Sequence, residues 1–260
     1  MRRLIIRPGA LGDLVVSLPA LESLRADYTE VWVADPNVSL IRFADKVEGI
    51  GAVGLDLLEL GLAPRRLVER LAGFNSIVSW YGESRMAFRD SVAGLPFEFH
   101  RALPSGSVHA VDFYLGQVGQ PPGGVPRIAG MHRDPSGYAA IHPFSGSPKK
   151  NWPLEKFQAV ARGLAIPVEW CAGPEEELAG ARRFASRWDL AEWLAGAEVY
   201  LGNDSGVSHL AAAVGTPVVA VFVATDPAVW APRAERVKVL VNPDVEQTRA
   251  AIRGSWLAAS

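Results

Sequence analysis

Short runs of apolar residues alternate along the chain with longer segments in which apolar residues recur every three to four positions. Runs of the first kind are typical of buried strands, and segments of the second kind are typical of amphipathic helices. Their regular alternation indicates an α/β fold with parallel sheets. In the first half of the chain the pattern predicts strands over 3–7, 30–35 and 76–82, and helices over 13–26, 63–71 and 108–118.

A segment rich in glycine and proline, residues 119–137, interrupts this alternation and has no hydrophobic period, as is typical of a linker. The pattern then restarts, so we expect two doubly wound domains, each binding ligands beyond the carboxyl ends of its strands. The second half predicts strands over 138–144, 166–173, 198–204, 217–223 and 236–241, helices that begin at Leu154, Glu175, Asp189 and Gly206, and a last helix over 245–258.

Composition and charge narrow the class of protein. Of the 260 residues 49% are hydrophobic, and 26 basic and 28 acidic side chains give a net charge of −2, which argues against nucleic-acid binding through a basic face. The single cysteine, Cys171, cannot form an intrachain disulfide, and we expect it to be buried. No apolar run reaches the length of a membrane span or a signal-peptide core, so we expect a cytoplasmic protein.

One cluster leaves peripheral contact with the inner face of a membrane open. Arg65, Arg66 and Arg70 stand beside leucines at helical spacing, and such a segment can present a basic amphipathic face. The surface of an ordinary solvated helix explains the same pattern.

The first predicted strand leads into a turn with Gly9 and Gly12, followed by Asp13. The turn lacks the third glycine of a dinucleotide fingerprint and the Lys-Ser/Thr pair of a Walker loop. Asp13 suits the N-terminus of a helix, as a cap or as a partner of the helix dipole. It equally suits a catalytic carboxylate at the end of a strand.

Two junctions in the second half favour phosphate. In HPFSGSPKKNWP, small residues let backbone N–H groups approach a phosphate, and a lysine adds positive charge. In GNDSGVSHLAAAVGTP, the end of a strand meets the N-terminus of a helix, which suits a diphosphate. Capping by Asp204 or Ser205 and a core position for His209 explain the second motif as well.

The segment AGPEEELAG contains three successive glutamates, Glu175 to Glu177. Acidic residues after a proline are typical of a helix start. A carboxylate can also accept hydrogen bonds from both hydroxyls of a ribose. The five histidines are scattered, and there is neither a cysteine cluster nor a DxD triplet, so we expect no metal.

Taken in order, GALGDLVVSLP, HPFSGSPKKNWP, AGPEEE and GNDSGVSHLAAAVGTP resemble the motifs of glycosyltransferase family 9, the lipopolysaccharide heptosyltransferases and their relatives. The resemblance implies the GT-B architecture, in which two Rossmann-like domains with doubly wound parallel sheets face a cleft. It divides the chain into an N-terminal acceptor-side domain over 1–125, a C-terminal donor domain over 126–245, and a C-terminal helix over 246–260 that packs back on the first domain.

The same resemblance implies an inverting, metal-independent transfer without a cofactor. The co-substrate would be a nucleotide-diphosphate sugar, ADP-heptose, and the acceptor a lipopolysaccharide-core or related glycan, or a lipid-linked one. Asp13 matches the general base, and Lys150 matches the residue that meets the donor diphosphate. The remaining matches are the glycine loop of Gly9 and Gly12 and the donor-binding residues Ser145, Gly146, Glu176, Asp204, Ser205, Gly206 and His209, with Glu175 and Glu177 as alternatives to Glu176.

Two other classes stay open. A sugar-nucleotide epimerase of GT-B build would need acid and base groups on both sides of one sugar carbon and would work without an acceptor. A nucleotide-sugar-binding protein without catalysis would carry the same donor motifs. Analysis of reaction products separates all three.

Overall fold

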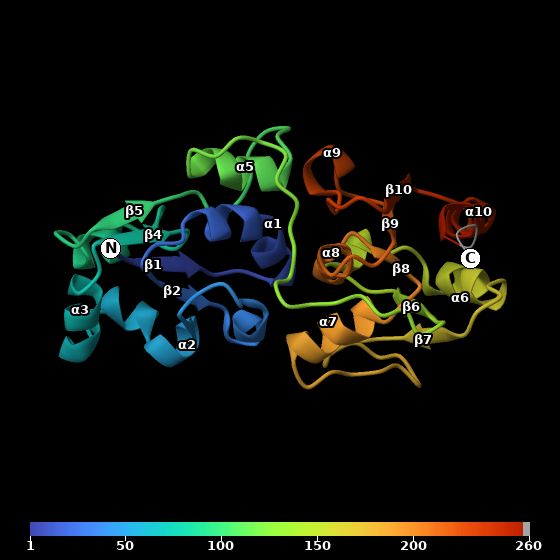
Figure 1. Cartoon of the computed structure of the whole chain (residues 1–260), viewed down its shortest axis with the longest axis horizontal. Coiled ribbons are helices and arrows are strands. Elements are labelled where there is room, and N and C mark those ends of the chain that lie inside the picture. Colours follow the sequence, from blue (N-terminus) through green and yellow to red (C-terminus); the bar gives the residue numbers. More distant parts are fainter. Residues whose placement is uncertain (257–260) are drawn as a thin grey trace. The chain divides into compact units, whose positions relative to one another are not determined.

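The computed structural model describes residues 1–256, and this part of the chain forms two compact α/β units. The N-terminal unit comprises residues 1–106 and 111–124, and the C-terminal unit comprises residues 107–110 and the chain from 125 onward (Figure 1). The segment 119–137, predicted as a linker, has no helix or strand.

The N-terminal unit is built on a five-stranded parallel sheet with the strand order β3-β2-β1-β4-β5. Its central strand has the apolar run Leu4–Ile6 in its middle, and Ile5 stands in register with Val31 on one side and Val78 on the other. The strands are β1 (Arg2–Arg7), β2 (Tyr28–Val33), β3 (Lys46–Gly49), β4 (Ser76–Ser79) and β5 (Phe97–Phe99). The helices are α1 (Leu11–Ser23), α2 (Ile50–Val53), α3 (Arg65–Ala72), α4 (Met86–Ser91) and α5 (Ala110–Gln117), with 3-10 turns η1 (Asp35–Leu40) and η2 (Leu55–Leu58).

Helix α3 uses its leucines for the core. Leu67 and Leu71 are buried in a cluster with Trp32 of β2. Arg70 forms ion pairs with Glu30, which is buried, and with Glu48. Arg65 and Arg66 stay exposed, and Arg65 pairs with Glu69 one turn along the same helix, so contact of this face with a membrane stays a prediction. No helix within residues 1–256 has the length and apolar character needed to cross a membrane.

The described part of the C-terminal unit contains a second five-stranded parallel sheet, with the order β10-β9-β8-β6-β7. Its strands are β6 (Ala139–His142), β7 (Val168–Trp170), β8 (Val199–Asn203), β9 (Val218–Phe222) and β10 (Val237–Val241). Its helices are α6 (Leu154–Arg162), α7 (Arg187–Ala195), α8 (Gly206–Ala213), α9 (Pro227–Trp230) and α10 (Val245–Trp256), with the 3-10 turn η3 (Pro148–Lys150).

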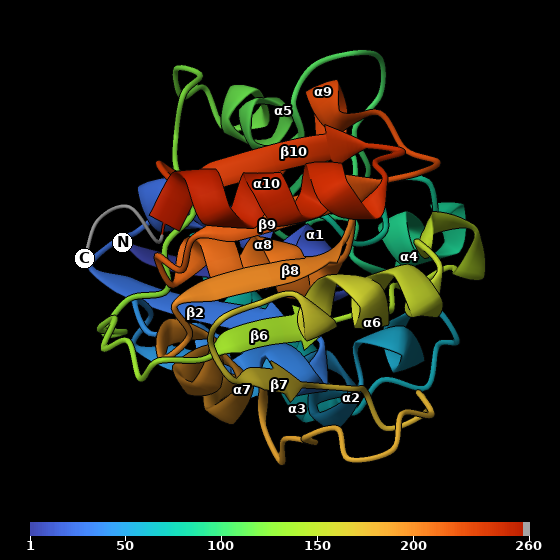
Figure 2. The same cartoon turned by 90° about the vertical axis from the view of Figure 1, so that its right-hand side faces the viewer.

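Helices α6 and α10 cover one face of this sheet, and α7 and α8 lie behind it (Figure 2). Phe157 of α6 and Ile252 of α10 join Ile141, Leu201 and Val221 in the core beneath them. Helix α10 packs against α6 and β9 of its own unit, and the expected packing of this helix on the N-terminal domain stays a prediction. The part of this prediction that concerns residues 257–260 lies outside the described residues.

The helix predicted from Glu175 is wrong. Residues 174–186 form turns, and an isolated parallel bridge joins Cys171 to Arg182. Gly180 has a φ of +74°, a left-handed conformation that favours glycine and interrupts a helix. The carboxylate of Glu176 accepts the backbone N–H of Gly173, so this one of the three glutamates stabilises a loop.

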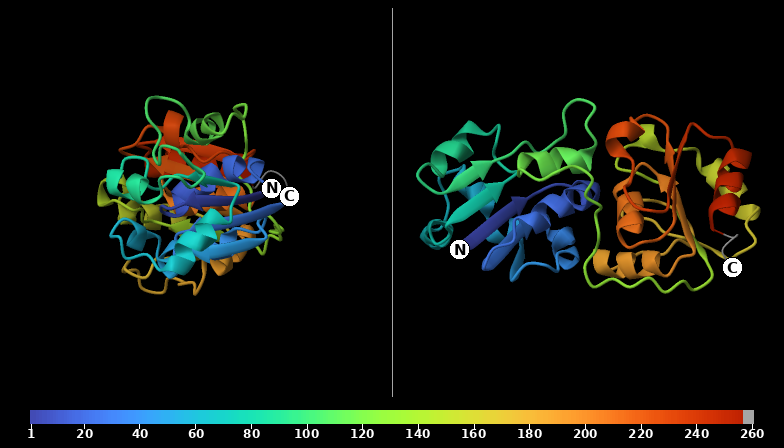
Figure 3. Two further views of the ribbon diagram at one scale, coloured as in Figure 1. Left: turned by 90° about the vertical axis from the view of Figure 1, so that its left-hand side faces the viewer. Right: turned by 45° about the horizontal axis from the view of Figure 1, so that its top comes forward.

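In each sheet the strand order reverses between two neighbours, at β1 and β4 in the first unit and at β6 and β8 in the second (Figure 3). Consecutive connections on either side of such a point run in opposite directions along the sheet, which opens a crevice at the carboxyl ends of the two strands. Doubly wound folds bind ligands there. The loops that follow β1, β6 and β8 are therefore the first places to look for chemistry.

Candidate functional site

Asp13 lies in the first turn of α1, just beyond the carboxyl end of β1. Its Oδ2 accepts the N–H of Ala10 at 2.9 Å. Gly9 has a φ of +114°, and a Cβ there would lie 2.9 Å from both Cβ and Oδ2 of Asp13, so this position requires glycine. Gly12 lies inside α1 instead of in the turn. One oxygen of Asp13 thus caps the helix, and no hydrogen bond engages Oδ1 within residues 1–256.

Arg7 is buried beneath this turn with 1% of its surface exposed, and the motif analysis gave it no role. Its guanidinium donates to the carbonyls of Pro8 and Asp13, to Ser17 Oγ and to the hydroxyl of Tyr114, at 2.8–3.1 Å. Burial lowers the pKa of Arg7, although Tyr114 and Asp13 act in the opposite direction. Burial also raises the pKa of Tyr114 to about 12. A buried cation therefore holds the backbone that carries Asp13.

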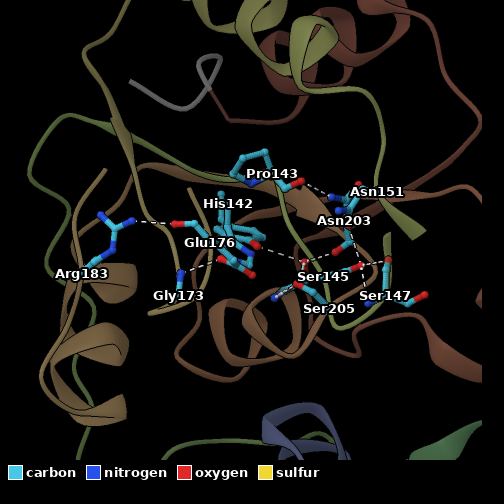
Figure 4. A network of polar contacts seen from close by, with 12 residues as sticks. His142, Pro143, Ser145, Ser147, Asn151, Gly173, Glu176, Arg183, Asn203 and Ser205 are labelled. Carbon is cyan, nitrogen blue, oxygen red and sulfur yellow. Dashed lines mark hydrogen bonds and ion pairs between the residues drawn. The ribbon is translucent and has the colours of Figure 1, made fainter. Parts of the chain in front are cut away.

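In the C-terminal unit the loop after β6 is held by hydrogen bonds among its own residues (Figure 4). The hydroxyl of Ser145 lies 2.8 Å from the carbonyl of Ser147 and 2.7 Å from Oδ1 of Asn151. Gly146 is exposed at the outer turn, and a Cβ there would meet no atom within 4 Å. The backbone of the loop at Gly146 is therefore open to a ligand.

Asn203, the last residue of β8, anchors both ends of this loop. Its side chain is fully buried, its Nδ2 donates to the carbonyl of Pro143 at 2.8 Å, and its Oδ1 accepts the N–H of Trp152 at 2.8 Å (Figure 4). From the sequence, Asn203 was predicted only to lie at the end of a strand. An amide followed directly by Asp204 and Ser205 was the available signal, but its partners are about 50 and 60 positions away along the chain.

Lys150 and Asp204 form an ion pair, with Nζ 2.9 Å from Oδ2. The same oxygen accepts the hydroxyl of Thr225 at 2.6 Å. The side chain of Asp204 is 5% exposed and that of Lys150 is 34% exposed. Asp204 is therefore the counter-ion of Lys150, and the interpretation of Asp204 as a helix cap is wrong.

Ser205 is the N-cap of α8 and accepts the N–H of Ser208 at 3.4 Å. Gly206 is the first residue of the helix, so its N–H lies among the amides at the N-terminus that have no partner in the preceding turn. His209 follows within the same helix and is 5% exposed. This terminus combines free backbone donors with the partial positive charge of the helix dipole.

Glu176 is held by two donors to the same oxygen (Figure 4). Its Oε2 accepts the N–H of Gly173 at 2.6 Å and lies 2.9 Å from Nε2 of His142. Burial opposes ionisation of Glu176, but the hydrogen bonds from His142 and Gly173 and the charges of His142 and Arg183 outweigh it and lower the pKa of Glu176. Within the part of the chain that the structure describes, no protein group donates to Oε1.

The C-terminal unit thus gathers the predicted donor residues at the carboxyl ends of three adjacent strands, β8, β6 and β7. Glu175 and Glu177 make no hydrogen bond or ion pair to this network, so Glu176 is the glutamate that faces it. Asp13, Gly9 and Gly12 belong to the N-terminal unit. No group of three or more His, Cys, Asp or Glu side chains suitable for a metal ion occurs among the described residues.

This chain is similar in sequence to a known protein family and to one of the curated proteins. Residues 128–255 match the model of glycosyltransferase family 9 (heptosyltransferase). Lipopolysaccharide heptosyltransferase 3 of Escherichia coli (strain K12) is 32% identical over 38% of this chain and 35% of its own length, so the match spans about a third of that relative.

Two solved structures are similar over the whole chain. The E. coli heptosyltransferase WaaC with ADP has a TM-score of 0.70 and 19% identity, covering 98% of both chains. The E. coli ADP-heptose lps heptosyltransferase II has a TM-score of 0.75 and 14% identity, covering 99% of both chains. These likenesses confirm the predicted fold, with two Rossmann-like parallel-sheet domains as in GT-B proteins.

Proposed function

We propose, from the match of residues 128–255 to the model of glycosyltransferase family 9, that this chain transfers a sugar from a nucleoside-diphosphate sugar to an acceptor hydroxyl, with inversion and without a metal. The observation that carries the proposal is the group of Lys150, the N-terminus of α8 and Glu176 at one sheet edge. A cation and free amides suit a diphosphate, and a carboxylate with one unengaged oxygen suits a ribose diol.

The donor in this proposal is ADP-heptose, and the acceptor is a lipopolysaccharide-core or related glycan. Support comes from the family description, from the curated relative named as a lipopolysaccharide heptosyltransferase, and from the ADP bound to the similar WaaC. The acceptor side rests on the names of the relatives alone.

In the proposed reaction the acceptor oxygen attacks the anomeric carbon as the bond from that carbon to the diphosphate breaks. The acceptor proton passes to Oδ1 of Asp13, the oxygen that does not cap α1. The electron pair of the broken bond leaves on the nucleoside diphosphate. Lys150 and the amides at Ser205 and Gly206 stabilise that growing negative charge, which is the electrostatic contribution that a divalent metal supplies in other enzymes.

Thermal unfolding in the presence of nucleotides is the first test. The protein is heated with ADP, GDP, UDP or dTDP, and with ADP-heptose. A ligand present at 100 times its Kd stabilises the folded state by roughly 2.7 kcal/mol. Selective stabilisation by ADP and ADP-heptose supports the proposed donor, preference for another nucleotide replaces that donor, and no response to any of them contradicts a nucleotide-sugar site.

Product analysis with an acceptor glycan then tests the reaction. A new glycosidic bond of inverted anomeric configuration, formed equally well with EDTA present, supports the proposal. A changed donor sugar without an acceptor indicates an epimerase, and donor binding without any product indicates a binding protein. Loss of transfer in EDTA that Mg²⁺ restores contradicts the metal-free mechanism.

A further inference from the structure

Thr225 lies outside every motif that the sequence analysis singled out. It belongs to the loop between β9 and α9, and its hydroxyl donates to Oδ2 of Asp204 at 2.6 Å. The start of α9 does not use this hydroxyl, because the N-cap of that helix is Asp226, whose Oδ1 accepts the N–H of Ala228 at 2.9 Å. The side chain of Thr225 is therefore directed to the Lys150–Asp204 pair and not to its own loop.

The geometry of this pair creates a problem for diphosphate binding. Asp204 is almost completely buried, and a buried carboxylate is costly unless it keeps its partners. Lys150 is its ionic partner within the described residues, and it is also the cation assigned to the donor phosphates. When a diphosphate arrives, one ammonium group has to serve two anions. The hydroxyl of Thr225 is the donor that stays with Asp204.

We propose that Thr225 is a positioning residue for donor binding: it holds the carboxylate of Asp204 so that Lys150 can share its charge with the diphosphate. The proposal rests on the proposed function of this site. An ammonium group has three N–H donors, so Lys150 can keep one hydrogen bond to Asp204 and direct the others to phosphate. Without the hydroxyl, Oδ2 depends on Lys150, and the competition between carboxylate and phosphate becomes stronger.

The test compares Thr225→Val, which removes the hydroxyl and keeps the shape of the side chain, with Thr225→Ser, which keeps the hydroxyl. Thr225→Ala is a second deletion of the hydroxyl if the valine variant folds poorly. Binding is measured by calorimetry with inorganic pyrophosphate and with whichever of ADP, GDP, UDP and dTDP binds the wild type most tightly. Each variant is also made in the Lys150→Ala background, which completes a double-mutant cycle.

We expect Thr225→Val to raise the Kd for both ligands about tenfold, the change that loss of one hydrogen bond to a charged group produces. Thr225→Ser is expected to bind within about twofold of wild type, and in the Lys150→Ala background the valine substitution is expected to have little effect. A purely structural role would give the same loss in both backgrounds.

Wild-type affinity in both Thr225→Val and Thr225→Ala overturns this inference, and so does an equal loss in the presence and absence of Lys150. Both results leave the proposed donor site in place. If the wild-type protein binds neither pyrophosphate nor any of the four nucleoside diphosphates, the proposed function fails, and this inference fails with it.

Discussion

At the level of a single residue, the two oxygens of Asp13 have different surroundings, which allows the proposed role as a base beside a structural role. Oδ2 accepts the N–H of Ala10 and stabilises the start of α1, whereas Oδ1 makes no hydrogen bond to any described residue. Capping and catalysis are therefore compatible here, and substitutions can separate them.

Asp13→Asn keeps an oxygen for the N–H of Ala10 but cannot accept the proton of an acceptor hydroxyl. We expect transfer to fall by about 10²–10⁴-fold while nucleotide binding and stability stay close to wild type. Asp13→Ala is the matched control, since it also removes the cap and should cost about 1 kcal/mol in the free energy of unfolding. Transfer rates, calorimetry and urea unfolding measure the three quantities. Near-normal transfer by Asp13→Asn would show that Asp13 is not the base.

We expect Glu176 to make the stability of the folded state depend on pH. Its pKa is lowered in the folded state, so the folded state binds fewer protons than the unfolded chain at mildly acidic pH. The ionised carboxylate therefore stabilises the fold above the ordinary pKa of a glutamate. That contribution is lost as the pH falls below the ordinary pKa of a glutamate and through the lowered pKa of Glu176.

Glu176→Gln removes this titration and keeps the size of the side chain. We expect the wild type to lose stability relative to Glu176→Gln as the pH falls from about 5 to about 3, with a constant difference above pH 6. Urea unfolding at a series of pH values measures both curves. Glu155→Gln, at an exposed position of α6, is the control for general effects of losing a carboxylate. Parallel curves for wild type and Glu176→Gln would contradict the assignment.

At the scale of elements, Asn203 shows how a strand end fixes a ligand loop. Two hydrogen bonds from one buried amide hold the carbonyl of Pro143 and the N–H of Trp152, on either side of the loop that carries Lys150. Asn203→Ala leaves both buried backbone groups without this partner. We expect it to lower the free energy of unfolding by about 2–4 kcal/mol.

The same substitution is expected to weaken binding of a nucleoside diphosphate, because the loop that carries Lys150 loses the two hydrogen bonds that Asn203 makes to its ends. Calorimetry measures this effect, and Ser145→Ala is the comparison, since it removes a hydrogen bond inside the loop but leaves the anchor intact. If Asn203→Ala binds as tightly as wild type, the loop is ordered by other contacts.

Elements could be predicted from the sequence where the residues that determine them lie within the element itself. Strand β9 is a continuous apolar run and β1 contains one over Leu4–Ile6, and the burial of these runs on both faces is visible in the pattern. The edge strands β3 and β5 were not predicted, because they are short and carry exposed Lys46 and Glu98. The helix expected from Glu175 failed because Glu176 binds the backbone of Gly173 and His142, contacts that local sequence does not reveal.

The residues of the candidate site also fall into a group that the sequence could predict and a group that it could not. Asp13, Lys150 and Ser205 stand at junctions between strands and turns or helices, so the order of elements is enough to select them. Arg7 and Thr225 were missed because their roles come from partners far apart in the chain, such as Tyr114 for Arg7. A buried arginine at the end of an apolar strand is a signal that sequence can offer, but the polar partners that satisfy it appear only in the fold.

At the scale of the whole molecule, the described residues form two units, each with its own parallel sheet and its own hydrophobic core. The proposed base belongs to the first unit, and the proposed donor-binding residues belong to the second. Donor binding should therefore depend on residues of one unit, whereas transfer should depend on residues of both.

Hydrogen exchange of the intact protein can test this division. A nucleoside diphosphate that binds at the carboxyl ends of β6, β7 and β8 should slow amide exchange over 143–152, 173–176 and 204–209, because ligand binding reduces local opening of the contacted segments. The core strands β1 and β4 of the other unit serve as the internal reference. We expect Lys150→Ala to reduce the protection at a fixed nucleotide concentration, and Asp13→Asn to leave it unchanged. Equal protection of both sheets would show instead that the nucleotide acts on the stability of the whole chain, and the assignment of donor binding to the second unit would then be wrong.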